Sequence, residues 1–415
     1  MKSKSVFTMQ TAGTPKIGKK RIFRRILTWF LAAAAALILA AGGLFLWALA
    51  STGTSLLARG LIWGDRTVED WKRLPSRTVA ASDTPMMFKK RTPAWLGDLK
   101  IDDKPFETFL EETGTTALVI LHGDEILYEG YFNGAGAGSI MPAFSAAKSF
   151  VSALLGIAIA EGFISSLDDP VTAYIPELSE RDGRFSRITL RRLVSMTSGL
   201  RFERYRSPWD DSSITYWSPD KRRAALETEI AETPGVGFLY NDYNTILLGM
   251  VLERATGMHV AEYFETRLWQ PMGAAADGSW SLDSEKSGFE AMSVGINGTA
   301  VDLARLGWLY FNEGKNGSRR VVPESWVSLT TESEDATDKV LEYQYGWWIN
   351  EPRGGRGFSA EGDLGQFICV YPEAGLVLAR FGRTTGGVYW TGLLSEIAAW
   401  IEQRLAVNGG TQDKT

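Results

Sequence analysis

The chain has 415 residues, of which 45% are hydrophobic and 22% charged, a composition typical of a globular protein rather than a disordered one. A formal net charge of −5 gives no reason to expect a nucleic-acid partner. The single cysteine, Cys369, excludes an intramolecular disulfide and is expected in a buried strand. The two histidines, His122 and His259, are too few for a three-histidine zinc site. We expect no metal and no cofactor.

The N-terminal part of the sequence has the pattern of a membrane anchor. Residues 1–25 are basic and contain no acidic residue, and residues 26–50 are uncharged and rich in Ala and Leu. A helix needs ~20 apolar residues to cross a bilayer, and a basic flank keeps its own side in the cytoplasm. We therefore interpret 26–50 as an uncleaved signal anchor of the inner membrane, with the rest of the chain extracytoplasmic. Cleavage after Ala50 and a buried soluble helix are the two alternatives.

After this anchor, the sequence predicts a connector and then one large domain. Residues 51–99 show no long periodicity and are interpreted as the connector, residues 100–407 as the domain and 408–415 as a tail. Within the domain a helical insertion of about 163–285 is expected. Strands before and after these helices indicate an α+β fold, in which an antiparallel sheet flanked by helices is interrupted by an all-helical part.

The individual elements follow from local patterns. The run 117–122, a Gly-Asp turn and 125–131 predict a β-hairpin. Further strands are expected at 345–349, 365–371 and 376–381, and helices at 144–162, 188–196, 244–256 and 300–312. Asp302 and Arg305 share a face of the last of these helices and predict an ion pair. The closing helix is marked by the apolar residues Leu393, Ile397, Ile401 and Leu405.

The helix at 144–162 is apolar on nearly every side, yet its first turn carries Ser145 and Lys148. Residues three apart on a helix share a face, so the hydroxyl and the amine can touch. Burial and the positive end of the helix dipole lower the pKa of a lysine, which then can take the serine proton. The free N–H of Ser145 is a candidate donor to an oxyanion. Because no Gly-x-Ser-x-Gly elbow surrounds Ser145, we expect its base not to be histidine.

A second stretch contains Tyr240 at the head of the helix at 244–256. Together with Ser145-x-x-Lys148 and the run 193–200 (Leu-Val-Ser-Met-Thr-Ser-Gly-Leu), it resembles the class C β-lactamase and penicillin-binding serine hydrolase family. The Met-Thr-Ser-Gly variant and the run 279–283 are similar to the branch of 6-aminohexanoate-dimer hydrolases and related esterases. This resemblance covers about residues 100–405. It implies that Ser145 forms an acyl-enzyme while Lys148 and Tyr240 shuttle its proton. A lysine ammonium beside Tyr240 is expected to lower the pKa of the phenol.

Two positions depart from the family pattern. Asp242 stands where the family usually has Asn, and a carboxylate there would keep Lys148 charged and shift the base role to Tyr240; Asn241 or Asn244 could replace the missing amide. The family's Lys-Thr-Gly strand corresponds to 358–366, with Ala-Glu-Gly at 360–362 as the best register. This stretch is expected to give the second oxyanion N–H. Its Glu361 and Asp363 would repel a carboxylated β-lactam and attract an amine. The expected substrate-binding residues are Asp242, Asn244, Glu361, Gly362, Gln366 and Tyr205.

Three functions are therefore weighed. The first is a membrane-anchored serine hydrolase that cleaves a small ester, amide or peptide. The second is a peptidoglycan D-amino-acid peptidase or β-lactamase, which the missing Lys-Thr-Gly disfavours. The third is a non-catalytic binder of cell-wall peptides. The aromatic side chains near the motifs either line an acyl pocket or belong to the core; these are Tyr205, Trp209, Trp217, Trp347 and Trp348.

Overall fold

A computed structural model describes residues 18–52, 56–204, 210–332, 342–350 and 355–409, which form two compact units, Met1–Ile62 and Trp63–Thr415. The first unit contains helix α1 (Gly18–Thr52), followed by α2 (Leu56–Trp63). Within α1, the stretch Arg21–Trp47 is long and apolar enough to cross a membrane. Its large apolar side chains, such as Trp29 and Leu37, are exposed. The predicted span 26–50 lies within this single helix.

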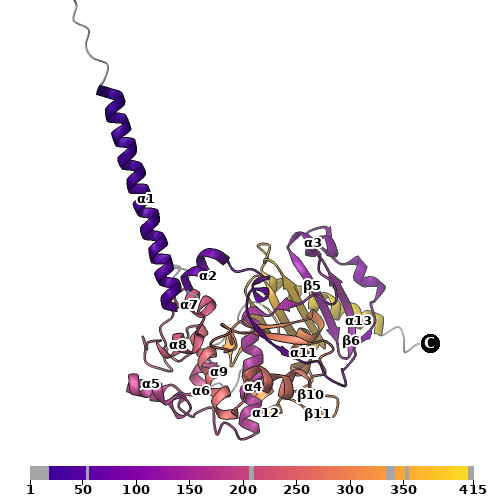
Figure 1. The fold of residues 1–415 in the computed structure, drawn as a ribbon. Coiled ribbons are helices and arrows are strands. Elements are labelled where there is room, and N and C mark those ends of the chain that lie inside the picture. The colour runs from indigo at the N-terminus through magenta and orange to yellow at the C-terminus, as the bar shows by residue number, and fades with distance from the viewer. Residues whose placement is uncertain (1–17, 53–55, 205–209, 333–341, 351–354, 410–415) are drawn as a thin grey trace, which may run out of the picture. The chain divides into compact units, whose positions relative to one another are not determined.

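The second unit is built on an eight-stranded sheet with the order β12-β13-β14-β15-β16-β5-β6-β2. Figure 1 labels two strands of this sheet, β5 and β6. All neighbouring strands pair antiparallel except β2 and β6, which are parallel. The strands are β12 (Tyr343–Gln344), β13 (Trp347–Ile349), β14 (Phe358–Gly362), β15 (Gln366–Tyr371), β16 (Leu376–Gly382), β5 (Thr115–His122), β6 (Glu125–Tyr131) and β2 (Lys89–Lys90).

Helices cover both faces of this sheet. Successive side chains of a strand point to opposite faces, so Val119 joins one hydrophobic cluster and Leu118 another. The first cluster includes residues of α4 (Ala147–Ala160) and α11 (Ala300–Phe311), and the second includes residues of α3 (Phe106–Glu112) and α13 (Trp390–Gly409). Two covered faces explain why β5, β15 and β16 are buried at nearly every position.

A smaller sheet has the order β1-β8-β9-β7, with β1 (Ser76–Val79), β8 (Gly278–Ser281), β9 (Ile296–Gly298) and β7 (Met141–Pro142). Its first strand and β2 both come from the segment interpreted as a connector. From Trp63 onward, that segment thus belongs to the same compact unit as the large sheet. Two short hairpins complete the strands: β3 (Lys100–Ile101) with β4 (Lys104–Pro105), and β10 (Lys315–Asn316) with β11 (Arg319–Arg320).

Between α4 and β8 the described elements are helical. Most of these helices are short, whereas α9 (Asp242–Thr256) is long and ends at Gly257, whose φ of 68° is the left-handed C-terminal stop expected there. The others are α5 (Pro176–Arg181), α6 (Leu190–Val194), α7 (Asp211–Trp217), α8 (Lys221–Leu226) and α10 (Val260–Phe264). Helix α12 (Glu324–Thr331) follows α11. Short 3₁₀ turns include η1 (Asp70–Lys72), η2 (Ala94–Asp98), η3 (Phe144–Ala146), η4 (Val171–Ala173), η5 (Gly183–Arg187) and η8 (Pro372–Ala374), and one π turn is η6 (Glu265–Trp269).

Most predicted elements are confirmed, and two details differ. The hairpin β5–β6, the strands β15 and β16 and the helices α9, α11 and α13 lie where the sequence predicts them. The single strand predicted at 345–349 is wrong, because Tyr345 and Gly346 have positive φ values of 42° and 100° and form a turn between β12 and β13. This turn contacts α4, where Ser149 Oγ donates to the carbonyl of Gly346 at 2.7 Å. The predicted helical stretch to about 285 also includes strand β8.

Candidate active site

Ser145 and Lys148 lie where a 3₁₀ turn runs into a helix. Ser145 belongs to η3, and Lys148 is the second residue of α4. Since a 3₁₀ helix has three residues per turn, side chains three apart are stacked almost directly above one another. The Lys148 Nζ donates to the Ser145 Oγ at 3.0 Å. The sequence prediction of an i,i+3 contact is confirmed, although the first turn is 3₁₀ rather than α-helical.

The amine of Lys148 has three acceptors. Besides Ser145 Oγ, its Nζ donates to the backbone carbonyl of Ser293 at 3.3 Å and forms an ion pair with Asp242 Oδ1 at 2.7 Å. The lysine side chain is 2% exposed. An ammonium has three N–H donors and no lone pair, so three acceptors around it fit the charged form. Asp242 takes this position because it is the first residue of α9, directly after Tyr240 and the N-cap residue Asn241.

Burial and the ion pair act on these two groups in opposite ways. Burial lowers the pKa of Lys148, as the sequence predicts, and the Asp242 carboxylate opposes this by raising it. Burial acts to raise the pKa of Asp242, but the Lys148 ammonium outweighs it and holds that pKa below its usual range. Asp242 is therefore ionised at neutral pH, and its charge stabilises the ammonium form of Lys148.

Tyr240 completes the cluster. The Lys148 Nζ lies 4.8 Å from the centroid of the tyrosine ring, and the phenol of Tyr240 interacts with the Ser145 side chain, which acts to lower the phenol pKa. The expectation that Lys148 lowers the phenol pKa is wrong: burial raises the pKa of Tyr240, Asp242 raises it further, and the Ser145 side chain opposes both. The phenol is consequently protonated at neutral pH.

The end of β14 approaches the nucleophile closely. A Cβ added to Gly362 would lie 2.4 Å from the carbonyl oxygen of Ala143 and 3.1 Å from the Ser145 nitrogen. Only glycine allows this approach, and the Ser145 N–H therefore lies next to the last residue of the strand. The neighbouring residue Glu361 points to the other face of the sheet, where its carboxylate accepts from Ser359 Oγ at 2.8 Å and Thr391 Oγ1 at 3.2 Å.

The other expected substrate-binding residues occupy different surroundings. Asn244 is fully buried and accepts from Ser198 Oγ at 2.6 Å, and Asn241 caps α9 by accepting from the Tyr243 N–H at 2.8 Å. Neither of these asparagines has a described contact with Lys148, which meets Asp242 instead. Gln366 is buried; its amide donates to the carbonyls of Asp363 and Gly382. Tyr205 lies outside the described residues, as does Trp209.

The remaining candidate residues, three tryptophans and two histidines, lie in different surroundings. Trp348 stacks on Tyr240, with ring centroids 5.3 Å apart, and is partly exposed, which puts it at the site. Trp217 and Trp347 are buried in the interior. His122 pairs with Glu125 at the end of the β5–β6 hairpin, and His259 lies beside Arg77. Neither histidine has a described contact with Ser145, as the sequence predicts.

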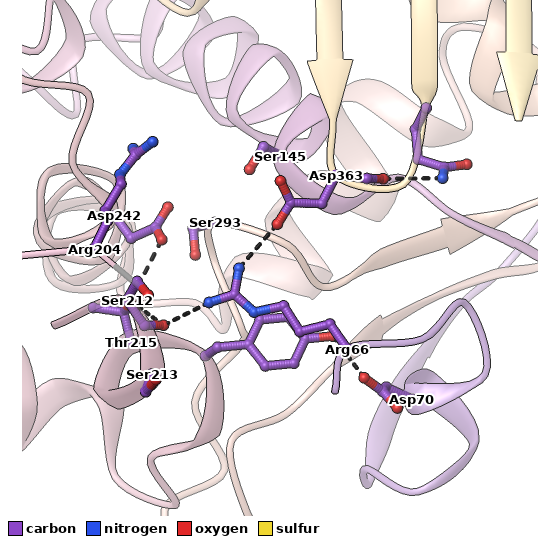
Figure 2. Close-up of polar contacts among 12 residues, drawn as sticks. Arg66, Asp70, Ser145, Arg204, Ser212, Ser213, Thr215, Asp242, Ser293 and Asp363 are labelled. Carbon is purple, nitrogen blue, oxygen red and sulfur yellow. Dashed lines mark hydrogen bonds and ion pairs between the residues drawn. The ribbon is translucent and has the colours of Figure 1, made fainter. Parts of the chain in front are cut away.

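Sequence reasoning missed two arginines near the cluster. Arg66 forms an ion pair with Asp363 at 2.9 Å, so the carboxylate that was expected to attract an amine is already neutralised (Figure 2). The guanidinium of Arg204 lies 5.0 Å from the Tyr240 ring centroid. Arg66 precedes Asp363 by 297 positions, so no local pattern could have revealed the pair. No spacing rule indicates the Ser293 carbonyl either.

Comparisons with known proteins identify the family of the chain. The sequence pattern of the family described as "Beta-lactamase" matches residues 103–391. The chain is 26% identical to the 6-aminohexanoate-dimer hydrolase of Paenarthrobacter ureafaciens, covering 83% of this chain and 96% of that protein. It is 29% identical to Esterase EstB of Burkholderia gladioli, over 44% and 52% of the two chains. The solved structure of a candidate 6-aminohexanoate-dimer hydrolase from Bacillus anthracis superposes with a TM-score of 0.71, at 24% identity and with 83% and 95% covered.

The chain belongs to the Beta-lactamase family of serine hydrolases, since the family pattern spans well over half of its length. Within that family, its similarity to the 6-aminohexanoate-dimer hydrolase extends over almost the whole of the relative. The resemblance stated from the sequence motifs is confirmed.

Proposed function

We propose that the chain is a membrane-anchored, extracytoplasmic serine hydrolase that cleaves an ester or amide through an acyl-enzyme on Ser145. One observation carries this proposal: Lys148 Nζ donates to Ser145 Oγ at 3.0 Å, and the phenol of Tyr240 interacts with the same side chain. A hydroxyl held between two proton-transfer groups is the arrangement that nucleophilic catalysis needs. The names of the relatives, a dimer hydrolase and an esterase, support the same reaction class.

The reaction follows from the positions of these groups. Once the cluster of Lys148 and Tyr240 has lost one proton, Ser145 Oγ attacks the carbonyl carbon and its proton passes to the cluster. The tetrahedral oxygen receives the Ser145 N–H and a second N–H from the end of β14, beside Gly362. The cluster returns the proton to the leaving amine or alcohol. Water then attacks the acyl-enzyme by the same route and releases Ser145.

Membrane anchoring is supported by α1. The uncharged part of this helix, residues 26–50, follows the basic residues of the N-terminus, and a basic flank retains that end in the cytoplasm. The helix contains few charges and exposes its large apolar side chains, as a lipid-facing segment does. The hydrolase unit would then lie on the extracytoplasmic side, where small amides, esters or peptides reach it from outside the cell.

An activated ester tests the reaction. We expect p-nitrophenyl acetate to give a burst of nitrophenol and a fluorophosphonate to label the wild-type protein, because both react with an activated serine. Ser145→Ala is expected to abolish the burst and the label while the protein stays folded. Wild-type protein without label or burst would contradict the proposal. Retained binding of cell-wall peptides without turnover would favour a binder, and acylation by a fluorescent penicillin a peptidase or β-lactamase.

A further inference from the structure

Arg66 connects three parts of the second unit close to the candidate nucleophile (Figure 2). Its Nη1 donates to Asp363 Oδ2 at 2.9 Å, and its Nη2 donates to the carbonyl of Ser212 in α7 at 2.8 Å. The guanidinium also lies over the ring of Tyr216, 4.4 Å from the centroid. Arg66 itself belongs to the irregular stretch between α2 and η1. One side chain from this stretch thus reaches the β14–β15 turn and α7 together.

The contact of Arg66 with Asp363 acts on the turn after β14. Asp363 directly follows Gly362, the residue whose backbone approaches the Ser145 N–H. The turn continues through Leu364 and Gly365, which have positive φ values of 62° and 88°. Gln366 holds the turn from the interior by donating to the carbonyl of Asp363 at 3.0 Å. Arg66 holds the same residue from the outer side.

The contact of Arg66 with Tyr216 acts on Phe144, the residue before the nucleophile. The Tyr216 ring is stacked on the Phe144 ring, with 6.4 Å between centroids and 9° between planes. Phe144 has a φ of 46°, a conformation that a bulky residue adopts only when its surroundings impose it. The Tyr216 hydroxyl donates to Asp70 Oδ2 at 2.9 Å. Arg66 and Asp70 therefore fix Tyr216 from two sides, and Tyr216 supports Phe144.

The exposure of the pair indicates a role other than stability. The side chains of Arg66 and Asp363 are 20% and 40% exposed, and an ion pair this accessible contributes little to folding. The guanidinium is nevertheless fixed at three points, so its conformational entropy has already been lost. The partners of this rigid side chain flank the nucleophile on both sides. Arg66 can therefore hold them in position as accurately as catalysis requires.

We propose that Arg66 is a positioning residue of the hydrolase: through Asp363 and through Tyr216 it fixes the end of β14 and Phe144 so that two N–H donors converge on the reacting carbonyl oxygen. This inference rests on the proposed function, and Arg66 itself does not touch the substrate. It makes the stretch that precedes β1 part of the active site. The family pattern, which begins at residue 103, does not include this stretch.

The charge of Arg66 also gives a measurable signature. Asp363 raises the pKa of Lys148, and Arg66 lowers that of Asp242. Removal of Arg66 leaves Asp363 without this partner, so the pKa of the Lys148–Tyr240 cluster rises and the acid limb of the rate profile moves to higher pH. The charged and titratable groups that face Lys148 and Tyr240 are Asp242 from α9, Arg204 from the loop before α7, Asp363 from the β14–β15 turn and Tyr343 from β12.

The test compares Arg66→Gln, Asp363→Asn and the double variant in the full-length chain. We expect Arg66→Gln to lower kcat about tenfold to a hundredfold with little change in KM, since positioning acts on the transition state. Asp363→Asn lowers kcat less, and the double variant is no slower than Arg66→Gln, because both changes remove one interaction. The acid limb of the pH–rate profile moves to higher pH in Arg66→Gln and returns to its wild-type position in the double variant. Arg66→Lys, which keeps the charge, recovers part of kcat.

The matched control is Arg91→Gln, which breaks the exposed ion pair of Arg91 with Glu125 at the far end of the β5–β6 hairpin. It is expected to leave kcat and the pH profile unchanged. An unchanged kcat in Arg66→Gln, or a double variant whose loss equals the product of the single losses, would overturn the inference. The thermal midpoint of each variant separates these results from unfolding. If the wild-type protein is not labelled by a fluorophosphonate, the proposed function fails instead.

Discussion

At the scale of single residues, the proposed mechanism depends on the protonation of Lys148. The ammonium form is surrounded by Ser145 Oγ, the Ser293 carbonyl and Asp242. The phenol of Tyr240 is also protonated, because burial raises its pKa. With both groups protonated, the hydroxyl of Ser145 has no acceptor for its proton. One proton must therefore leave the cluster before attack, and activity is expected to rise with pH.

Asp242→Asn tests which charge sets that pH. The carboxylate raises the pKa of both Lys148 and Tyr240, so its replacement by an amide lowers the pKa at which the cluster loses its proton. We expect the acid limb of kcat/KM to move to lower pH. The measurement is the pH profile of ester hydrolysis, with Asp98→Asn, a change at an exposed residue, as control. An acid limb that stays in place or moves to higher pH would contradict this account.

The predicted ion pair of α11 is confirmed and is fully buried, with Arg305 Nε 2.8 Å from Asp302 Oδ1. Asp302 also accepts from the N–H groups of Ala275 and Ala276. Asp302→Ala is expected to lower the free energy of unfolding by about 3–5 kcal/mol, since it leaves the guanidinium buried without its partner. Denaturant unfolding measures the loss. Glu227→Ala, which breaks an exposed pair with Arg223, is the control and should change little; equal losses in both variants would be inconsistent with the prediction.

At the scale of elements, the proposed oxyanion site depends on the contact between β14 and η3. Strand β14 is an interior strand between β13 and β15, and its position is fixed by both neighbours. It therefore cannot move away when its last residue becomes larger. Gly362 is the point where this rigid strand meets the backbone of Ala143 and Ser145.

Gly362→Ala is expected to reduce kcat/KM by about a hundredfold or more, because the added methyl group displaces the Ser145 N–H from the reacting oxygen. The fold is expected to remain, which near-UV circular dichroism would show. Gly183→Ala is the control, since a Cβ there meets no atom within 4 Å. Wild-type activity in Gly362→Ala would show that the approach of β14 is not needed for the reaction.

The elements differ in how far the sequence predicts them. The β5–β6 hairpin and the helix α9 were predictable because apolar periodicity, a Gly-Asp turn and Gly257 are local signals. The turn at Tyr345 and Gly346 was missed because it depends on hydrogen bonds from α4, which is distant in the sequence. Strands β1 and β2 are short and gain stability from partners far along the chain, so their local sequence carries little signal.

At the scale of the whole molecule, the proposed membrane anchor predicts which side of the membrane carries the hydrolase unit. Cys369 is the only cysteine and is buried, so a Cys369→Ala background is free of thiols. In this background, Gly183→Cys is expected to react with a membrane-impermeant maleimide in intact spheroplasts. Ser5→Cys, in the basic N-terminal segment, should react only after lysis. The reverse pattern would place the hydrolase unit in the cytoplasm.

In the candidate site, too, residues marked by a local sequence motif were predictable, and residues that depend on contacts with distant parts of the chain were not. Ser145, Lys148 and Tyr240 were predictable because each lies at the head of a helix with a recognisable motif, and the structure brings the three together. The sequence determined the substrate-binding roles of Glu361 and Gln366 less well. The face of the sheet to which each side chain points depends on the pairing register of β14 and β15. Arg66 could not be predicted, because its partners meet only in the folded unit.

If α1 anchors the chain in a bilayer, as proposed, the position of Arg66 limits where a protease could release the hydrolase unit in active form. The cut would have to fall after Trp47, where the apolar stretch of α1 ends, and before Arg66. A cut after Arg66 would remove the guanidinium beside Asp363, and we expect the released form to turn over substrate slowly.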